Sequence, residues 1–288
     1  MLILFILPAL ALVILLIFLP VVLNVYYSFF KWTAYSKTME FNGVKYYIKL
    51  FTDEEVWSAL LNNVRYAVVS IIFQVGLGLI LAHIFVICAN HRYAAITRVV
   101  IFIPAVISLT AIGLLWVILY SPTIGIVNPL LEAIGLGSLA NDWLGNPKTA
   151  MYAVIAVSQW QYTGEMIMLY TVGLQSVPTE IYESAKIDGA NGIQSFFHIT
   201  IPSIKSTILM NMTVTIIGAF MVFDEVYVMT SGGPGKTTEV LATMMYETAP
   251  SFWILRTMRK SSPIKICCWV GCSSTRCWWV WSLPYCLW

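Results

Sequence analysis

Long apolar stretches separated by polar segments dominate the chain and predict membrane-spanning helices. A helix needs roughly 20 apolar residues to cross a hydrocarbon core of about 30 Å. The stretches of that length are Leu2–Leu23, Val64–Ala89, Val99–Tyr120, Ala150–Gln175 and Ser206–Met229. We therefore expect an all-α, polytopic integral membrane protein with these five transmembrane helices.

The first stretch has a second interpretation, a cleaved signal peptide. Ala9-Leu10-Ala11 resembles a cleavage site, but no positive segment precedes the apolar run. The run also continues well past this triplet, whereas the apolar part of a signal peptide is short. We expect a retained transmembrane helix.

The composition supports a membrane protein and excludes one class of partner. Of 288 residues, 59% are hydrophobic and only 10% are charged, against about 25% charged in soluble domains. The net charge is +2 without any basic run, so we expect no nucleic-acid partner. Lys and Arg do not fix the orientation, because Lys31–Arg65 and the connector with Arg92 and Arg98 are both basic and must lie on opposite sides.

The composition changes abruptly near residue 250, which divides the chain into 1–249 and an anomalous tail, 250–288. Five of the six cysteines and five of the eleven tryptophans lie in the last 22 residues, and no Asp or Glu follows Glu247. Our hypothesis is a shifted reading frame that scrambles a sixth transmembrane helix; the alternative is a genuine Trp-rich interfacial tail. Sequencing the coding DNA tests this, since the hypothesis fails if no other frame restores an apolar stretch.

A polar segment, Val177–Lys205, interrupts the apolar pattern between the fourth and fifth stretches. Pro178 suits the first turn of a helix, and Glu180 and Glu183 suit its positive end. Asp188-Gly189 predicts the end of that helix, because glycine takes the left-handed backbone of a C-cap. Asn191-Gly192 permits a second bend.

The rest of this segment predicts a second short helix and a shallow surface. Ser195–Ile201 is expected to be helical and to break at Pro202. Small residues at Ser184, Ala185, Gly189 and Ala190 leave a face that a partner protein could approach closely. The alternative is an ordinary loop between two membrane helices.

This segment closely resembles the EAA motif of permease subunits in binding-protein-dependent ABC importers. In that motif Glu-Ala-Ala is followed by Gly and later by Pro; here Glu183 and Ala185 match, and Ser184 replaces the alanine between them. The resemblance covers about Leu4–Ala249. Further stretches resemble the carbohydrate-uptake branch: Asn62-Asn63, Gln74 with Gly76-x-Gly78, Ile103-Pro104, Trp116, Trp143-Leu144-Gly145, Gly173–Pro178, Phe223-Asp224 and Gly232–Gly235.

The resemblance implies the type I ABC importer permease fold, of which the sixth helix is missing or scrambled here. It places the N-terminus and the 177–205 loop in the cytoplasm, and Lys31–Asn63, Ser121–Lys148 and Thr230–Glu247 outside. It also implies that the loop docks in a cleft of a separate ATPase. The residues expected to couple to this ATPase are Glu183, Ser184, Ala185, Asp188, Gly189, Ala190, Ile201 and Pro202.

The same resemblance implies a set of partners and a location. These are a second permease subunit, a dimer of ATP-binding cassette ATPases that holds ATP and Mg, an extracytoplasmic sugar-binding protein and the sugar itself. No cofactor is expected on this chain. The location is the cytoplasmic (inner) membrane of a bacterium or archaeon, where the chain crosses the lipid bilayer several times.

Aromatic, amide and acidic residues inside the apolar stretches are candidates for a sugar pathway. Sugar hydroxyls need hydrogen bonds and sugar C–H faces need flat apolar contacts. The candidates are Gln159, Trp160, Tyr162, Glu165, Asn211, Phe220 and Asp224, and ordinary helix packing is the alternative for each. Glu165 either lines the pathway or is protonated and packed, since a charge at mid-span is costly. Asp224 suits a structural or gating role.

We find no arrangement of residues for catalysis or metal binding. His83, His91 and His198 lie on separate segments, and the clustered cysteines lack CxxC spacing. Gly235-Lys236-Thr237 fails as a phosphate loop, because Thr230 stands where that motif needs glycine. We expect a sugar permease rather than an enzyme. A permease for phosphate, peptides or amino acids, a passive channel and a membrane enzyme are the alternatives.

Overall fold

The computed structural model describes residues 2–31, 39–87 and 91–248. The chain divides into two compact units, Met1–Met244 and Met245–Trp288, and the architecture below is that of the first. Helix α15 (Leu241–Thr248) crosses the boundary between the units. The tail 250–288, with its hypothesis of a scrambled helix, lies outside the described residues.

The first predicted span is helical and continues further than expected. It comprises α1 (Leu2–Val13), the π-helical segment η1 (Ile14–Phe18) and α2 (Leu19–Ser28). The continuous apolar part, Ile6–Ser28, has 23 residues, long enough to cross a membrane. A pair of antiparallel two-residue strands, β1 (Phe30–Lys31) and β2 (Glu40–Phe41), and helix α3 (Lys45–Thr52) follow.

The second predicted span begins about ten residues earlier than Val64. Helix α4 (Glu54–Ser70), the π-helical segment η2 (Ile71–Leu77) and α5 (Gly78–Ile87) form one helix, of which Glu54–Val86 is continuous. It starts after Asp53, whose carboxylate accepts a 3.1 Å hydrogen bond from the Glu55 backbone N–H. The polar residues after Glu54 extend the helix beyond its apolar part.

The third predicted span is wrong as a single helix. Helix α6 (His91–Val106) and helix α7 (Leu109–Leu119) meet at an angle of 100°. Ser108, with φ −55° and ψ 131°, has left the helical region. The break is stabilised from outside, since the Gln161 side-chain amide donates to the Ile107 carbonyl at 3.5 Å.

The fifth predicted span is also broken. Helix α13 (Lys205–Met221) ends at Val222, whose ψ is 125°, and a separate short helix, α14 (Asp224–Met229), follows. Asp224 and Glu225 occupy the first turn of α14, where the positive end of a helix favours acidic side chains. The acidic pair therefore starts a new helix instead of ending the old one.

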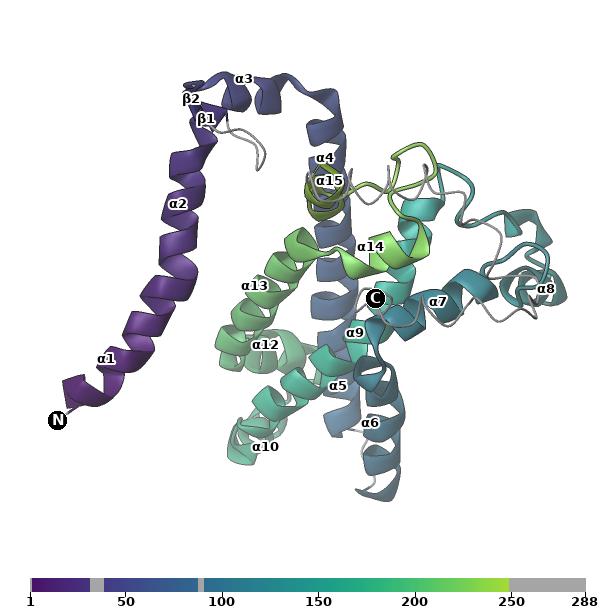
Figure 1. The fold of residues 1–288 in the computed structure, drawn as a ribbon. Helices are drawn as coiled ribbons and strands as arrows, with labels where there is room; N and C mark the ends of the chain where they lie inside the picture. Colours follow the sequence, from purple (N-terminus) through teal and green to yellow (C-terminus); the bar gives the residue numbers. More distant parts are fainter. Residues whose placement is uncertain (1, 32–38, 88–90, 249–288) are drawn as a thin grey trace, which may run out of the picture. The chain divides into compact units, whose positions relative to one another are not determined.

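Helix α9 (Ala150–Gln175) has the bounds expected for the fourth span and lies in the core. Fifteen of its 26 residues are buried, and it packs against α5, α6, α4 and α13 (Figure 1). Two apolar clusters form along it. Their central members are Ile112, Val154, Val157, Val226 and Val240 in one cluster and Val75, Ile167, Tyr170, Leu174 and Ile204 in the other.

The number of spans stays an expectation. By length and apolar composition, two described helices can cross a membrane, or up to four if each bent pair counts as one span. Helix α9 is not one of these, because Gln159, Gln161 and Glu165 interrupt its apolar sequence. Neighbouring helices cover α9, so its side chains need less apolar character than those of a lipid-facing helix.

Candidate functional site

The segment after α9, residues 177–205, forms a compact unit of short helices that we call the hook. Helix α10 (Thr179–Ile187) ends as predicted at Asp188-Gly189, and Gly189 has a φ of +83°. The Ala190 N–H bonds to the Ala185 carbonyl at 2.9 Å, and the Gly189 N–H bonds to the Lys186 carbonyl at 3.1 Å. This pair of bonds is a Schellman motif. Pro178 precedes the helix as its N-cap and is not in its first turn.

The second half of the hook is also helical. It comprises α11 (Gly192–Ser195), the π-helical segment η4 (Phe196–Thr200) and α12 (Ile201–Ser203). Asn191 begins it with a reciprocal capping box, in which its side chain and that of Gln194 bond each other's backbone N–H groups. The helix does not break at Pro202, which lies near its C-terminal end; the 73° bend comes after Ser203.

The two halves of the hook hold each other in place. The Tyr182 hydroxyl on α10 hydrogen-bonds the buried Thr200 hydroxyl at 3.1 Å. Ala185 faces inward and is only 8% exposed, so the expectation that it contributes to an open face is wrong. Glu183, Ser184, Asp188, Gly189 and Pro202 are exposed, while Ala190 and Ile201 are partly covered. Large apolar side chains are exposed beside them: Ile187, Ile193 and Phe197.

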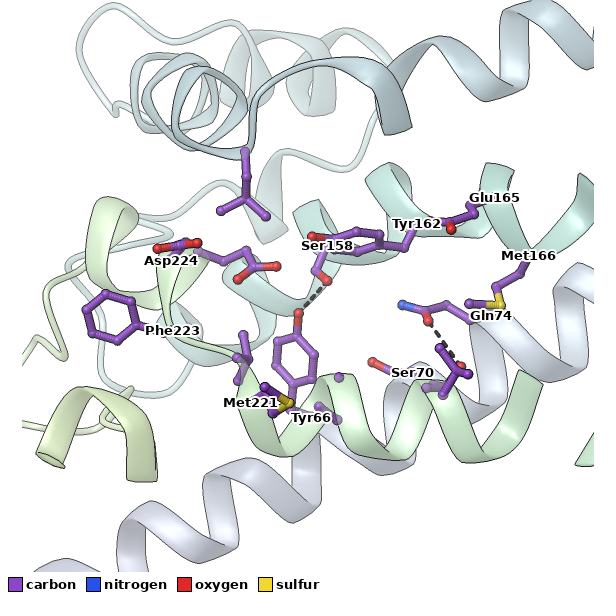
Figure 2. Close-up of a pocket in the computed structure, with 17 residues that line it drawn as sticks. Tyr66, Ser70, Gln74, Ser158, Tyr162, Glu165, Met166, Met221, Phe223 and Asp224 are labelled. Carbon is purple, nitrogen blue, oxygen red and sulfur yellow. Dashed lines mark hydrogen bonds between the residues drawn. The ribbon is translucent and has the colours of Figure 1, made fainter. Parts of the chain in front are cut away.

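A cavity of about 320 Å³ lies between α4, η2, α9, α13 and the start of α14 (Figure 2). Tyr162, Glu165 and Asp224, three of the predicted pathway residues, line it. Glu165 and Asp224 are exposed in this chain, and Tyr162 is partly buried. These three side chains therefore face one space, although they come from two different helices.

The other four predicted pathway residues are not among those that line the cavity. Trp160 points outward and contacts the Trp116 ring edge-on at 5.7 Å between centroids. The Gln159 amide is buried and donates to the Ser70 hydroxyl at 3.0 Å. Asn211 is buried, and its amide nitrogen has no hydrogen-bond partner among the described residues; Phe220 is exposed.

The cavity also has polar residues that sequence reasoning missed as site residues. On one wall the Tyr66 hydroxyl donates to the Ser158 hydroxyl, and on another Thr215 donates to the Gln74 side-chain oxygen at 3.4 Å (Figure 2). Glu225 lies within hydrogen-bonding reach of Tyr162. Ser158 could have been found from helical spacing, because positions 158, 162 and 165 share one face of α9.

A second polar network holds the middle of α4. The Asn62 amide donates to the carbonyls of Thr237 and Glu239, both at 2.9 Å. The neighbouring Asn63 accepts from the Leu241 backbone N–H at 3.0 Å. This network attaches the loop after α14 to the helix that forms one wall of the cavity.

Comparisons with known proteins identify the same architecture. The family described as binding-protein-dependent transport system inner membrane component matches residues 74–255. The probable ABC transporter permease protein YurN of Bacillus subtilis is 47% identical over 85% of this chain and 84% of its own. The lactose transport system permease protein LacF of Rhizobium radiobacter is 34% identical over 86% and 84%.

A solved structure agrees on the fold. It is the crystal structure of a bacterial ABC transporter that imports the acidic polysaccharide alginate. One of its chains superposes with a TM-score of 0.72 at 23% identity, covering 88% of this chain and 84% of that one. The chain is therefore a transport subunit of the inner membrane rather than an enzyme, and it belongs to the family of binding-protein-dependent transport system inner membrane components, the permeases of ABC importers.

Proposed function

We propose that this chain forms one half of the membrane channel of an ATP-driven sugar importer. One observation carries the proposal: the hook 177–205 joins α9 to α13, and both of these helices line the cavity. A protein that moves the hook therefore moves two walls of the cavity. The name of the Rhizobium radiobacter relative, a lactose permease, supports a sugar as the substrate.

The hook is suited to docking on a separate protein. Its Schellman turn and capping box fix the backbone at both bends. Ile187 is 87% exposed, and burying such a side chain in a partner stabilises the contact by roughly 1.5–3 kcal/mol. We propose that the partner is one subunit of an ATPase dimer and that this dimer holds ATP and Mg²⁺, while this chain binds no cofactor.

The remaining partners follow from this arrangement. A second permease subunit faces the open side of the cavity, where Glu165 and Asp224 are exposed. A sugar-binding protein docks on the outer segments Lys31–Asn63, Ser121–Lys148 and Thr230–Glu247. ATP-driven closure of the ATPase dimer then opens the cavity alternately to the two sides of the membrane.

Replacing Gly189 by Trp tests the docking role. The matched control is Gly135→Trp, because Gly135 closes helix α8 (Val127–Ala133) with the same bonds, a φ of +80° and equally open surroundings. Both variants carry the same backbone strain, but only Gly189 lies on the hook. We expect Gly189→Trp to insert into the membrane yet lose the ATPase on purification and lose sugar uptake, whereas Gly135→Trp keeps the ATPase. Wild-type uptake by Gly189→Trp would refute the proposal.

A further inference from the structure

The cavity carries charge of one sign. Glu165, Asp224 and Glu225 line it, and within the described part of the chain no Lys, Arg or His does. Glu225 is only 7% exposed. A buried carboxylate is costly unless a positive charge or several hydrogen bonds compensate it. This wall of the cavity is therefore suited to a cationic group that arrives from outside the chain.

An unpaired donor on a different wall also points to a ligand. Gln74 on η2 is 5% exposed, and its side-chain oxygen accepts from Thr215. Its amide nitrogen makes no hydrogen bond to the described residues, and Figure 2 shows this nitrogen pointing into the cavity. A hydroxyl oxygen of a bound sugar would accept a hydrogen bond from this cavity-facing nitrogen.

We propose that the cavity selects a carbohydrate that carries a protonated amine and disfavours an acidic sugar. This inference rests on the proposed function, sugar import, and names the class of sugar. The ammonium group would lie among the three carboxylates, and the sugar hydroxyls would bond Gln74 and Tyr162. A volume of about 320 Å³ is within the usual range for a small-molecule site.

The proposed preference for a positively charged sugar follows from the acidic residues of the cavity and not from the fold. The alginate importer has the same fold and carries an acidic polysaccharide. An acidic sugar in the cavity described here would meet like charges at close range. Even at an effective dielectric of 20, two such charges 4 Å apart interact by about 4 kcal/mol.

Three disaccharides with one β-1,4-linked backbone test the proposal: the diamine obtained by deacetylating N,N′-diacetylchitobiose, neutral cellobiose, and cellobiouronic acid. Their binding to the complete transporter in nanodiscs is measured by calorimetry at a pH where the amines are protonated. The binding protein is left out, so that its own specificity does not enter. We expect the diamine to bind about tenfold more tightly than cellobiose and the acid to bind most weakly.

Variants test whether the cavity residues cause the stronger binding of the diamine. Glu225→Gln should lower the diamine-to-cellobiose affinity ratio severalfold. Glu165→Gln should do the same, and because Glu165 is exposed in the isolated chain, this exchange does not disturb the packing of the chain itself. Glu132→Gln on α8, outside the cavity, should leave the ratio unchanged. Equal binding of diamine and cellobiose, or a ratio that neither cavity variant changes, overturns this inference and leaves sugar import standing. Binding of none of the three sugars overturns both proposals.

Discussion

The side-chain amide of Asn63 on α4 donates a buried 2.9 Å hydrogen bond to the backbone carbonyl of Ala219 on α13. Helix α13 ends two residues later, at Met221, so its last carbonyls lack partners within the helix. Asn63 supplies one, and its side-chain oxygen accepts from the Leu241 N–H at 3.0 Å. One side chain thus stabilises both the break beside the cavity and the loop that joins α14 to α15.

Replacing Asn63 by Ala should lower the free energy of unfolding by about 2–4 kcal/mol. The reason is that one buried and one partly buried backbone group lose their partner, and a buried group costs about 1–3 kcal/mol when left unsatisfied. Thermal unfolding of the purified protein in detergent measures the change. Asn24→Ala, the same exchange at an exposed position on α2, should have little effect. A loss below about 0.5 kcal/mol in Asn63→Ala would contradict this account.

Replacing Gly164 by Ala should separate α6 from α9. A Cβ atom at Gly164 would lie 2.1 Å from the Ile101 carbonyl oxygen on α6, far inside van der Waals contact. We expect a loss of roughly 1–3 kcal/mol, as for other overpacked cores, measured by chemical unfolding. Gly76→Ala, where the nearest atom is 3.9 Å away, should be neutral or stabilising because alanine favours helix. Equal stability of the two variants would argue against this close approach.

Replacing Ile187 by Asp should weaken docking of the ATPase without changing the fold. The side chain is 87% exposed in the isolated chain, so its removal loses contacts only in the complex. The expected loss of affinity is about tenfold or more, measured by titrating the ATPase onto the permease in nanodiscs. Ile124→Asp is the control, since Ile124 is 73% exposed in the proposed outer segment. Equal weakening by both variants would place the docking surface elsewhere.

The ion pair between Glu55 and Lys236 should contribute little to stability. The two groups are 2.6 Å apart, but both side chains are more than half exposed, and exposed pairs contribute about 0–1 kcal/mol. Glu55→Gln is therefore expected to change the melting temperature only slightly, and less at high salt than at low salt. A large, salt-independent decrease would show that the pair is shielded from solvent in the assembled transporter.

Some of this architecture could be predicted because local signals mark it. The Asp53-Glu54-Glu55 start of α4 and the Asp188-Gly189 end of α10 are set by capping within a few residues. The bounds of α9 agree with the apolar pattern. The family could also be predicted, since the hook's motif is a contiguous stretch of sequence.

The breaks within the third and fifth spans could not be predicted from the apolar pattern. Composition stays apolar through Ile107 and Val222, and the hydrogen bonds that make these breaks tolerable come from distant residues, Gln161 and Asn63. Those donors become neighbours of the breaks only once α4 and α9 have packed. Hydropathy indicates whether a segment is apolar enough to lie in lipid. It contains no information on where the helix is interrupted.

The cavity was predicted in part. Residue type alone selected Gln159 and Trp160 together with Tyr162, although a helix turns about 100° per residue and directs these side chains to different faces. Tyr162 and Glu165 line the cavity because they lie three positions apart. Their roles in sugar transport stay predictions, as do those of Asp224 and the hook residues.

Helix α9 runs without interruption for 26 residues, a length of about 39 Å at 1.5 Å per residue. Because the helix is continuous, a tilt of about 10° at the end that joins the hook would displace its other end by about 7 Å. Helix α13, in contrast, is interrupted at Val222, so the following helix α14 need not move with it. Because the hook joins both elements, its movement would displace the continuous helix α9 and the interrupted pair α13 and α14 differently. The width of the cavity between them would then change.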